Sequence, residues 1–198
     1  LKSVLENKYK LKVETLSGES CDNQEVKILN KVVRWTSAGI ELEADPRHAE
    51  LVVRELGLEG ATVSKVPGVK PVGETIDRTE EPELDKETAR KYRAISARLN
   101  YLAPDRMDLA YSVKEAARCM ASPRLSDFEK LKRIGRYLIA KPRLVSKFGW
   151  QTGNDMITVY SDSDWAGDKA TCKSTSGGIA VRGTHVLKSY SKQQRTVA

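Results

Sequence analysis

Period-two alternation of apolar and polar residues marks the first third of the chain. Residues 26–35 and residues 40–43 show it on either side of a turn-like stretch at 37–39, which predicts an antiparallel β-hairpin. We expect Trp35 to pack on this sheet, because aromatic side chains bury large apolar areas there. Weaker alternation over residues 8–16 predicts one further strand.

A helical pattern follows the hairpin. Asp45 and Pro46 favour a helix start, because aspartate accepts bonds from free backbone N–H groups and proline suits the first helical position. Apolar residues at helical spacing continue to residue 56, and Gly57 ends the helix. Residues 63–83 then combine prolines, glycines and acids without a period, which predicts an irregular linker and a domain boundary.

Three helices are predicted after the linker. They cover residues 85–102, the stretch from residue 105 to the Ser122-Pro123 stop, and residues 126–140. Asp105 with Asp108 resembles an N-terminal capping arrangement for the second helix. Ser126 with Glu129 predicts a capping box for the third.

From residue 144 the period returns to two. Four strands are predicted, at residues 144–150, 156–162, 178–182 and 185–191. Short sequential strands joined by turns that contain glycine form an antiparallel meander. The whole pattern predicts an α+β fold, with an N-terminal β-hairpin plus helix, a three-helix connecting region and a C-terminal antiparallel β-meander.

The formal net charge of +7 is concentrated in the middle of the chain. Residues 86–147 hold 16 lysines and arginines against 6 acids, and cations crowd on the third predicted helix and just after it. Such charge favours contact with a phosphate backbone, and a merely solvated basic face fits the composition equally well. The candidate nucleic-acid contacts are Lys130, Lys132, Arg133, Arg136, Lys141 and Arg143.

Three closely spaced carboxylates follow the predicted strand 156–162, at Asp162, Asp164 and Asp168. A carboxylate held at a strand end, beside a turn of small residues, lets a divalent cation and a phosphate approach. The pattern therefore favours a metal-assisted phosphodiester site. A solvated turn, which also contains Asp, Ser and Gly, is the alternative.

Two known loop motifs fail in this stretch. An EF-hand loop that started at Asp162 would have Ala166 at its fifth position and Lys173 at its twelfth, where a bidentate glutamate is needed. A phosphate-binding P-loop that started at Gly167 would have Cys172 in place of its second glycine. Neither motif explains the acids.

Composition bounds the class of protein. Hydrophobic residues at 39% and charged residues at 31% fit a globular chain, and no apolar run reaches the length of a membrane span or a signal-peptide core. Cys21, Cys119 and Cys172 lie far apart, so neither a zinc knuckle nor a disulfide framework is encoded. We expect an intracellular protein of the cytoplasm or nucleus, with no membrane partner.

Six blocks of the sequence resemble a known family. They are residues 99–102 (LNYL), 105–113 (DRMDLAYSV), 131–138 (LKRIGRYL), 160–167 (YSDSDWAG), 173–177 (KSTSG) and 191–198 (SKQQRTVA). They occur in the order seen in copia-type retrotransposon Pol polyproteins. They resemble the segment that joins the reverse transcriptase to its ribonuclease H (RNase H) domain.

The resemblance implies a division of the chain into four parts. These are the end of a reverse transcriptase palm and thumb-like segment at 1–60, an acidic linker at 61–84, a basic helical thumb and connection region at 85–143, and the truncated N-terminal part of an RNase H-like domain at 144–198. That domain opens with an antiparallel three-stranded meander.

The resemblance also implies roles for the acids. Asp162 is similar to the first catalytic, metal-binding aspartate of RNase H, and Asp164 is a supporting candidate beside the metal. In a complete site, two divalent cations, usually Mg²⁺, would activate water and stabilise the leaving oxygen. The paired-aspartate signature of the polymerase is absent from the sequence, and the second RNase H acid would follow Ala198. We therefore expect no hydrolysis by these 198 residues alone.

Two hypotheses follow. In the first, the chain is a fragment of a retrotransposon polyprotein whose parent is an RNA-directed DNA polymerase with RNase H activity. The fragment contributes nucleic-acid contacts and one metal-binding aspartate, and its partners are an RNA/DNA hybrid and the remainder of the Pol polyprotein. In the second, the chain is a non-catalytic remnant or domesticated protein that binds nucleic acid through the basic helix.

Overall fold

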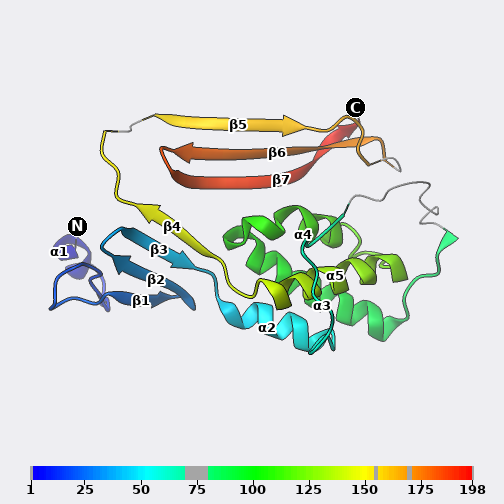
Figure 1. Ribbon diagram of the computed structural model, residues 1–198, viewed down its shortest axis with the longest axis horizontal. Helices are drawn as coiled ribbons and strands as arrows, with labels where there is room; N and C mark the ends of the chain where they lie inside the picture. The colour runs from blue at the N-terminus through cyan, green and yellow to red at the C-terminus, as the bar shows by residue number, and fades with distance from the viewer. Residues whose placement is uncertain (1, 70–79, 154–155, 169–170, 198) are drawn as a thin grey trace.

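The computed structural model describes residues 2–69, 80–153, 156–168 and 171–197. One antiparallel sheet extends from the end of a helical bundle, and a second sheet lies along the side of the bundle (Figure 1). The predicted mixed α+β architecture is confirmed. Among the described residues, no helix has the length and apolar character that crossing a bilayer requires.

The N-terminal sheet contains four antiparallel strands in the order β1-β2-β3-β4. Their bounds are β1 Glu25–Ile28, β2 Lys31–Thr36, β3 Gly39–Glu43 and β4 Val145–Gly149. The pairing of β2 with β3 confirms the predicted hairpin. The predicted strand 26–35 is instead two strands, because Leu29 and Asn30 have φ values of 51° and 64° and form the two-residue turn of a hairpin.

Strand β4 corrects the predicted topology. Residues 144–150 were expected to open the C-terminal meander, but β4 pairs with β3. The approach is close at Gly39, where a Cβ atom would lie 2.1 Å from the carbonyl oxygen of Phe148, so a side chain is excluded. The ring centroids of Trp35 and Trp150 lie 4.6 Å apart beside this contact, which confirms the expected packing of Trp35.

Five helices occur in the described parts of the chain. They are α1 Lys2–Glu6, α2 Pro46–Glu55, α3 Lys86–Leu102, α4 Ala110–Ala117 and α5 Leu125–Ala140, with the 3-10 turns η2 Ala103–Asp105 and η3 Met107–Leu109 between α3 and α4. The predicted strand over residues 8–16 is wrong, because this segment is irregular apart from an isolated bridge between Leu16 and Asn23.

The starts of α2 and α3 lie where the sequence predicts them. Asp45 accepts a bond from the N–H of Arg47 at 3.0 Å, and Pro46 is the first helical residue. Asp85 accepts bonds from the N–H groups of Glu87 at 2.9 Å and Thr88 at 3.0 Å. Both predicted helix starts are therefore confirmed.

The predicted starts of the next two helices are wrong. Helix α4 begins only at Ala110 and has no side-chain cap. The two expected capping carboxylates form ion pairs instead, Asp105 with Lys31 and Asp108 with Arg106. Helix α5 begins at Leu125, and the carboxylate that accepts the capping bond, from the N–H of Arg124 at 3.1 Å, is Asp127 rather than Glu129.

One apolar core joins α2, α3, α4 and α5. Its largest fully buried apolar side chains are Val52, Tyr92, Ile95, Leu99, Leu109, Val113, Leu131, Ile134 and Leu138. Helix α2 therefore shares its core with helices of the predicted 85–143 part. The four-part division of the chain stays a prediction, and residues 70–79 of the predicted linker lie outside the described residues.

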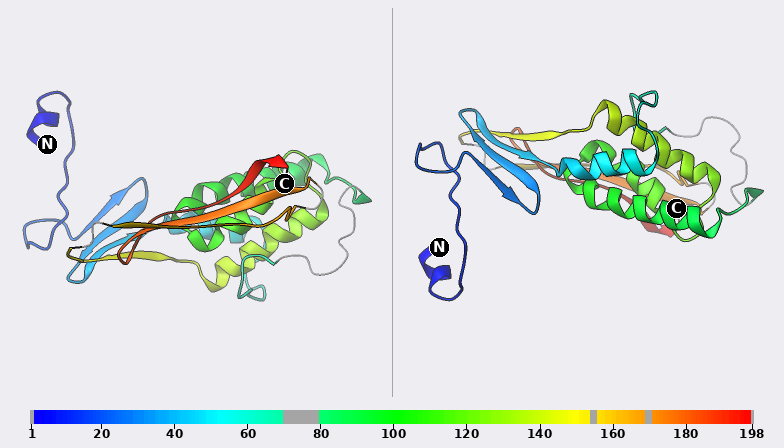
Figure 2. Two further views of the ribbon diagram at one scale, coloured as in Figure 1. Left: turned by 90° about the horizontal axis from the view of Figure 1, so that it is seen from above. Right: turned by 90° about the horizontal axis from the view of Figure 1, so that it is seen from below.

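The C-terminal sheet contains three antiparallel strands in the order β5-β6-β7. Their bounds are β5 Ile157–Ser163, β6 Lys173–Arg182 and β7 His185–Val197. Three of the four strands predicted for the meander are therefore present and paired in sequence order. Strand β5 forms one edge, and two opposite views show that the sheet overlies the helical bundle (Figure 2).

Candidate nucleic-acid interface and carboxylate site

Helix α5 has a buried face and a basic face. Phe128, Leu131, Ile134 and Leu138 are buried at helical spacing, because this side packs into the shared core. The lysines and arginines of the helix are on its remaining surface. Four of the six candidate nucleic-acid contacts lie there.

The two lysines of α5 have local acidic partners. Lys130 Nζ lies 2.9 Å from Asp127 Oδ1, and Lys132 Nζ lies 2.7 Å from Glu129 Oε1. Both pairs are three residues apart in the helix, a spacing at which opposite charges attract. Lys132 Nζ also lies 5.6 Å from the ring centroid of Phe128. Much of the lysine charge is therefore compensated within the helix.

The two arginines of α5 differ from the lysines. In the described parts of the chain, no ion pair or side-chain hydrogen bond joins Arg133 or Arg136 to a carboxylate. The Nε atom of Arg133 is buried there without a hydrogen-bond partner. Both guanidinium groups line a cavity of about 250 Å³ together with residues 61–64. The uncompensated positive charge of α5 is therefore at these two arginines.

The two candidates beyond α5 have structural contacts. The exposed Lys141 contributes its backbone carbonyl, which accepts a bond from Arg106 Nη2 at 2.9 Å. Arg143 donates from Nη2 to Glu43 Oε2 at 2.7 Å and from Nε to Oε1. The Arg143 side chain remains 60% exposed, so it keeps a solvent-facing part.

The ion pairs at Glu43 explain its acidity. Bonds from Arg143, opposed by burial and reinforced by bonds from Arg34, lower the pKa of the Glu43 carboxyl from 4.5 to about 2. Arg34 Nη1 lies 2.8 Å from Glu43 Oε2. Glu43 therefore joins β2, β3 and the segment before β4.

Sequence reasoning missed a buried arginine. The Arg106 side chain is 1% exposed, and its guanidinium binds both oxygens of Asp108, at 3.0 and 2.8 Å, as well as the carbonyls of Lys141 and Pro142. Burial raises the pKa of Asp108, but bonds from Arg106 and Tyr137 outweigh it and hold that pKa below its ordinary value. The contacts of Arg106 with Asp108 and with the two carbonyls fix the chain at the end of α5. The only sequence signal for this cluster was the position of Arg106 two residues before Asp108.

Asp162 lies near the end of β5, opposite Gly177 of β6. Gly177 and Thr175 are two residues apart on β6, so Asp162 shares their face of the sheet. This face is turned to the bundle, because Lys114 of α4 donates to Thr175 Oγ1 at 2.9 Å. Asp162 is exposed, and no hydrogen bond or ion pair engages its side chain among the described residues.

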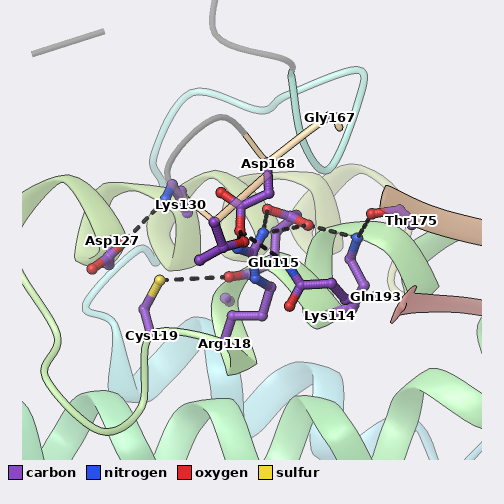
Figure 3. A network of polar contacts seen from close by, with 12 residues as sticks. Lys114, Glu115, Arg118, Cys119, Asp127, Lys130, Gly167, Asp168, Thr175 and Gln193 are labelled. Carbon is purple, nitrogen blue, oxygen red and sulfur yellow. Dashed lines mark hydrogen bonds and ion pairs between the residues drawn. The ribbon is translucent and has the colours of Figure 1, made fainter. Parts of the chain in front are cut away.

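The other two acids hold the loop after β5. Asp164 Oδ1 accepts bonds from the N–H of Thr175 at 2.7 Å and the N–H of Gly167 at 3.3 Å. Asp168 Oδ2 accepts bonds from Gln193 Nε2 at 2.9 Å and from Arg118, the residue directly after α4. Figure 3 shows Asp168 between these partners. Asp164 therefore shapes the loop, and Asp168 attaches it to the bundle.

The three carboxylates do not converge on one point. Among the described residues, the one cluster of three Cys, Asp or Glu ligand atoms lies at Glu19, Cys21 and Asp22, in a different part of the chain. Mg²⁺ needs a near-octahedral set of oxygen ligands. Asp162 fits such a set as one ligand, and the residues around it do not fit a complete site.

The chain is similar to two retrovirus-related Pol polyproteins of Arabidopsis thaliana. It is 34% identical over 166 residues to the polyprotein from transposon RE1 and 32% identical over 166 residues to the one from transposon RE2. Each match covers 80% of this chain and 11% of the polyprotein. The chain therefore spans about a tenth of the length of these relatives.

A shorter protein matches as well. The uncharacterized mitochondrial protein AtMg00810 of Arabidopsis thaliana is 25% identical over 169 residues, which are 81% of this chain and 68% of that protein. No family model and no solved structure matches the chain. The similarities to RE1, RE2 and AtMg00810 confirm the resemblance at the level of the polyprotein: the chain is related to a region of retrotransposon Pol polyproteins.

Proposed function

We propose that the chain is the part of a retrotransposon Pol polyprotein that joins a reverse transcriptase to an RNase H domain, and that it binds an RNA/DNA hybrid. The relation to Pol polyproteins supports the polyprotein context. The single observation that carries the binding role is the pair of uncompensated guanidinium groups, Arg133 and Arg136, on the basic face of α5. Guanidinium groups form bidentate, charge-assisted bonds with phosphates.

Charge reversal on α5 tests the binding role. Replacing Lys132, Arg133 and Arg136 by glutamate is expected to weaken binding of an RNA/DNA hybrid at least tenfold, because three phosphate contacts become repulsive. Fluorescence anisotropy with a labelled hybrid measures the affinity. The matched control is expected to retain most of the affinity. It reverses three exposed lysines of the irregular segment before β1, namely Lys8, Lys10 and Lys12. Equal losses in both variants would refute a specific contact surface.

Asp162 is the proposed catalytic contribution of the chain. We propose that its carboxylate supplies one ligand to a Mg²⁺ centre of RNase H type, whose remaining acids come from elsewhere in the polyprotein. Its exposure near the end of β5 and its lack of a partner among the described residues support this role. The pairing of β5, β6 and β7 in a three-stranded meander agrees with the expected opening of that domain.

The role of Asp162 is tested in the complete polyprotein. Asp162→Asn is expected to abolish cleavage of the RNA strand while hybrid binding is retained, because only the metal ligand is changed. Asp164→Asn is the control, since the amide keeps an oxygen that can accept the bonds from Thr175 and Gly167. Retained cleavage in Asp162→Asn would remove Asp162 from the site.

A second candidate function is nucleic-acid binding without catalysis. The similarity to AtMg00810, a protein of which 68% is covered by the match, favours it, since related sequence occurs there outside a long polyprotein. This function predicts salt-dependent binding through α5 and no cleavage by any longer form of the protein. Hybrid cleavage that depends on Asp162 would exclude it.

A further inference from the structure

The cavity beside Arg133 and Arg136 is formed by two segments far apart in the sequence. Its lining residues are Ala61, Thr62, Val63, Ser64, Arg133 and Arg136. Residues 61–64 follow α2 and lie beside α5 in two opposite views of the molecule (Figure 2). The sequence placed them at the start of a linker, so their meeting with the basic face is a finding of the structure.

Close packing at Gly135, next to Arg136 in the sequence, brings α5 against the end of α2. A Cβ atom on Gly135 would lie 2.6 Å from Leu58 Cδ1 and 2.8 Å from Leu56 Cδ1, so the absence of a side chain lets α5 approach the end of α2. Gly57 and Gly60 have φ values of 66° and 77°, which turn the chain back after α2. Residues 61–64 are thereby directed along α5.

Backbone bonds then fix the segment. The N–H of Ser64 donates to the carbonyl of Arg136 at 3.2 Å, and the N–H of Ala61 donates to the carbonyl of Leu58 at 2.9 Å. The hydroxyl of Ser64 donates to the carbonyl of Val66 at 2.8 Å, whereas no hydrogen bond engages the hydroxyl of Thr62 in the described residues. The cavity therefore has a fixed wall and one free hydroxyl.

The charge of the cavity is positive. Arg133 and Arg136 contribute two guanidinium groups, and its lining contains no acid. The buried Nε of Arg133 has no hydrogen-bond partner among the described residues, and burial of an unsatisfied donor is unfavourable. An anion with several acceptor oxygens would bind the guanidinium groups that line the cavity and offset the repulsion between the two arginines.

We infer that this cavity is a binding site for one phosphate group, held by Arg133, Arg136 and the hydroxyl of Thr62. Its volume of about 250 Å³ lies just below the range of drug-sized ligand sites, about 300 to 1,000 Å³, and leaves room for one phosphate group. The phosphate comes either from a nucleic-acid backbone or from free phosphate. A phosphate of a nucleic-acid backbone as the ligand rests on the proposed function, whereas binding of free phosphate does not.

Calorimetric titration of the 198-residue chain with inorganic phosphate near neutral pH tests the site. The double variant Arg133→Gln with Arg136→Gln is expected to lose at least about tenfold in affinity, because two charge-assisted bonds disappear. The matched control, Lys86→Gln with Lys91→Gln, removes the same charge from two exposed positions of α3 and is expected to change the affinity less than about threefold. Thr62→Val, which keeps the side-chain shape, is expected to weaken binding about threefold.

Several outcomes would overturn the inference. They are no heat of phosphate binding to the unmodified chain, equal losses in the two double variants, or full affinity in the arginine variant with its helical circular dichroism intact.

Competition with a labelled RNA/DNA hybrid identifies the source of the phosphate. Displacement of the hybrid by phosphate supports a backbone phosphate in the cavity, and phosphate binding without displacement supports a free anion. Phosphate binding by a chain that binds no hybrid would leave the site standing and refute the proposed function alone.

Discussion

Replacing Glu43 by glutamine removes the charge that holds the N-terminal sheet to the segment before β4. The Glu43 side chain is 3% exposed and accepts bonds from Arg34 of β2 and from Arg143. Glutamine keeps the size of the side chain, so the packing is preserved while both ion pairs are lost. The variant therefore isolates the electrostatic contribution of this carboxylate.

The magnitude follows from the pKa of Glu43. Its decrease from 4.5 to about 2 corresponds to at most about 3 kcal/mol of stabilisation by the charged form. Solvent screens part of this, because the Arg143 side chain is 60% exposed. We expect Glu43→Gln to lower the free energy of unfolding by about 2 kcal/mol at neutral pH, which shifts the urea midpoint by about 1 M.

The pH dependence has a defined sign. A lowered folded-state pKa contributes stability that is present above the unfolded value near 4.5 and is lost as the pH falls toward about 2. The difference between the unmodified chain and Glu43→Gln should therefore shrink over this window. Tryptophan fluorescence during urea unfolding measures it, since Trp35 and Trp150 lie 4.6 Å apart at this sheet.

The control is another glutamate of the same strand. Glu41 Oε1 lies 3.2 Å from Lys147 Nζ, and the Lys147 side chain is 75% exposed, so Glu41→Gln should cost less than about 1 kcal/mol. Equal effects of the two substitutions, or a Glu43→Gln effect that stays constant down to pH 2, would refute the assigned role of the Glu43 ion pairs.

Two further substitutions test the packing around the proposed sites. Gly135→Ala should lower the free energy of unfolding by about 1 to 3 kcal/mol and weaken phosphate binding, because the added methyl group displaces Leu58. Thermal unfolding and calorimetry measure these two effects, and unchanged values would contradict the close packing. Arg118→Gln should speed amide hydrogen exchange in the loop at Asp168 by about fivefold while leaving α3 unchanged, because the ion pair between the end of α4 and the loop is lost. Equal exchange in both forms would contradict this attachment.

Local signals in the sequence were sufficient for several elements. Asp45 with Pro46 specified the start of α2 through a bond within two residues, and the structure contains it. The start of α3 also lies where the sequence predicts it, and the structure adds the cap at Asp85. The turn at Leu29 and Asn30 escaped prediction because leucine rarely adopts a positive φ. The pairing of β4 with β3 was not predicted, because pairing between strands about a hundred residues apart depends on packing that no local pattern records.

The candidate site shows the same limit. The charge of α5 was visible in the sequence, but the difference between its paired lysines and its unpaired arginines depends on which acids lie within reach. The i,i+3 spacing of Asp127 with Lys130 could have indicated this pairing. The contact of Arg136 with Ser64 could not be predicted, because it depends on the close packing at Gly135.

The central claim is that the basic face of α5 binds the phosphate backbone of an RNA/DNA hybrid. Its most direct test is the affinity of the unmodified 198-residue chain for a labelled hybrid, measured by anisotropy between about 50 and 200 mM salt. We expect the logarithm of the affinity to fall linearly with the logarithm of the salt concentration, and the slope to decrease by about two in the Arg133→Gln, Arg136→Gln variant. No binding at the lowest salt concentration, or a slope that the variant leaves unchanged, would contradict the claim.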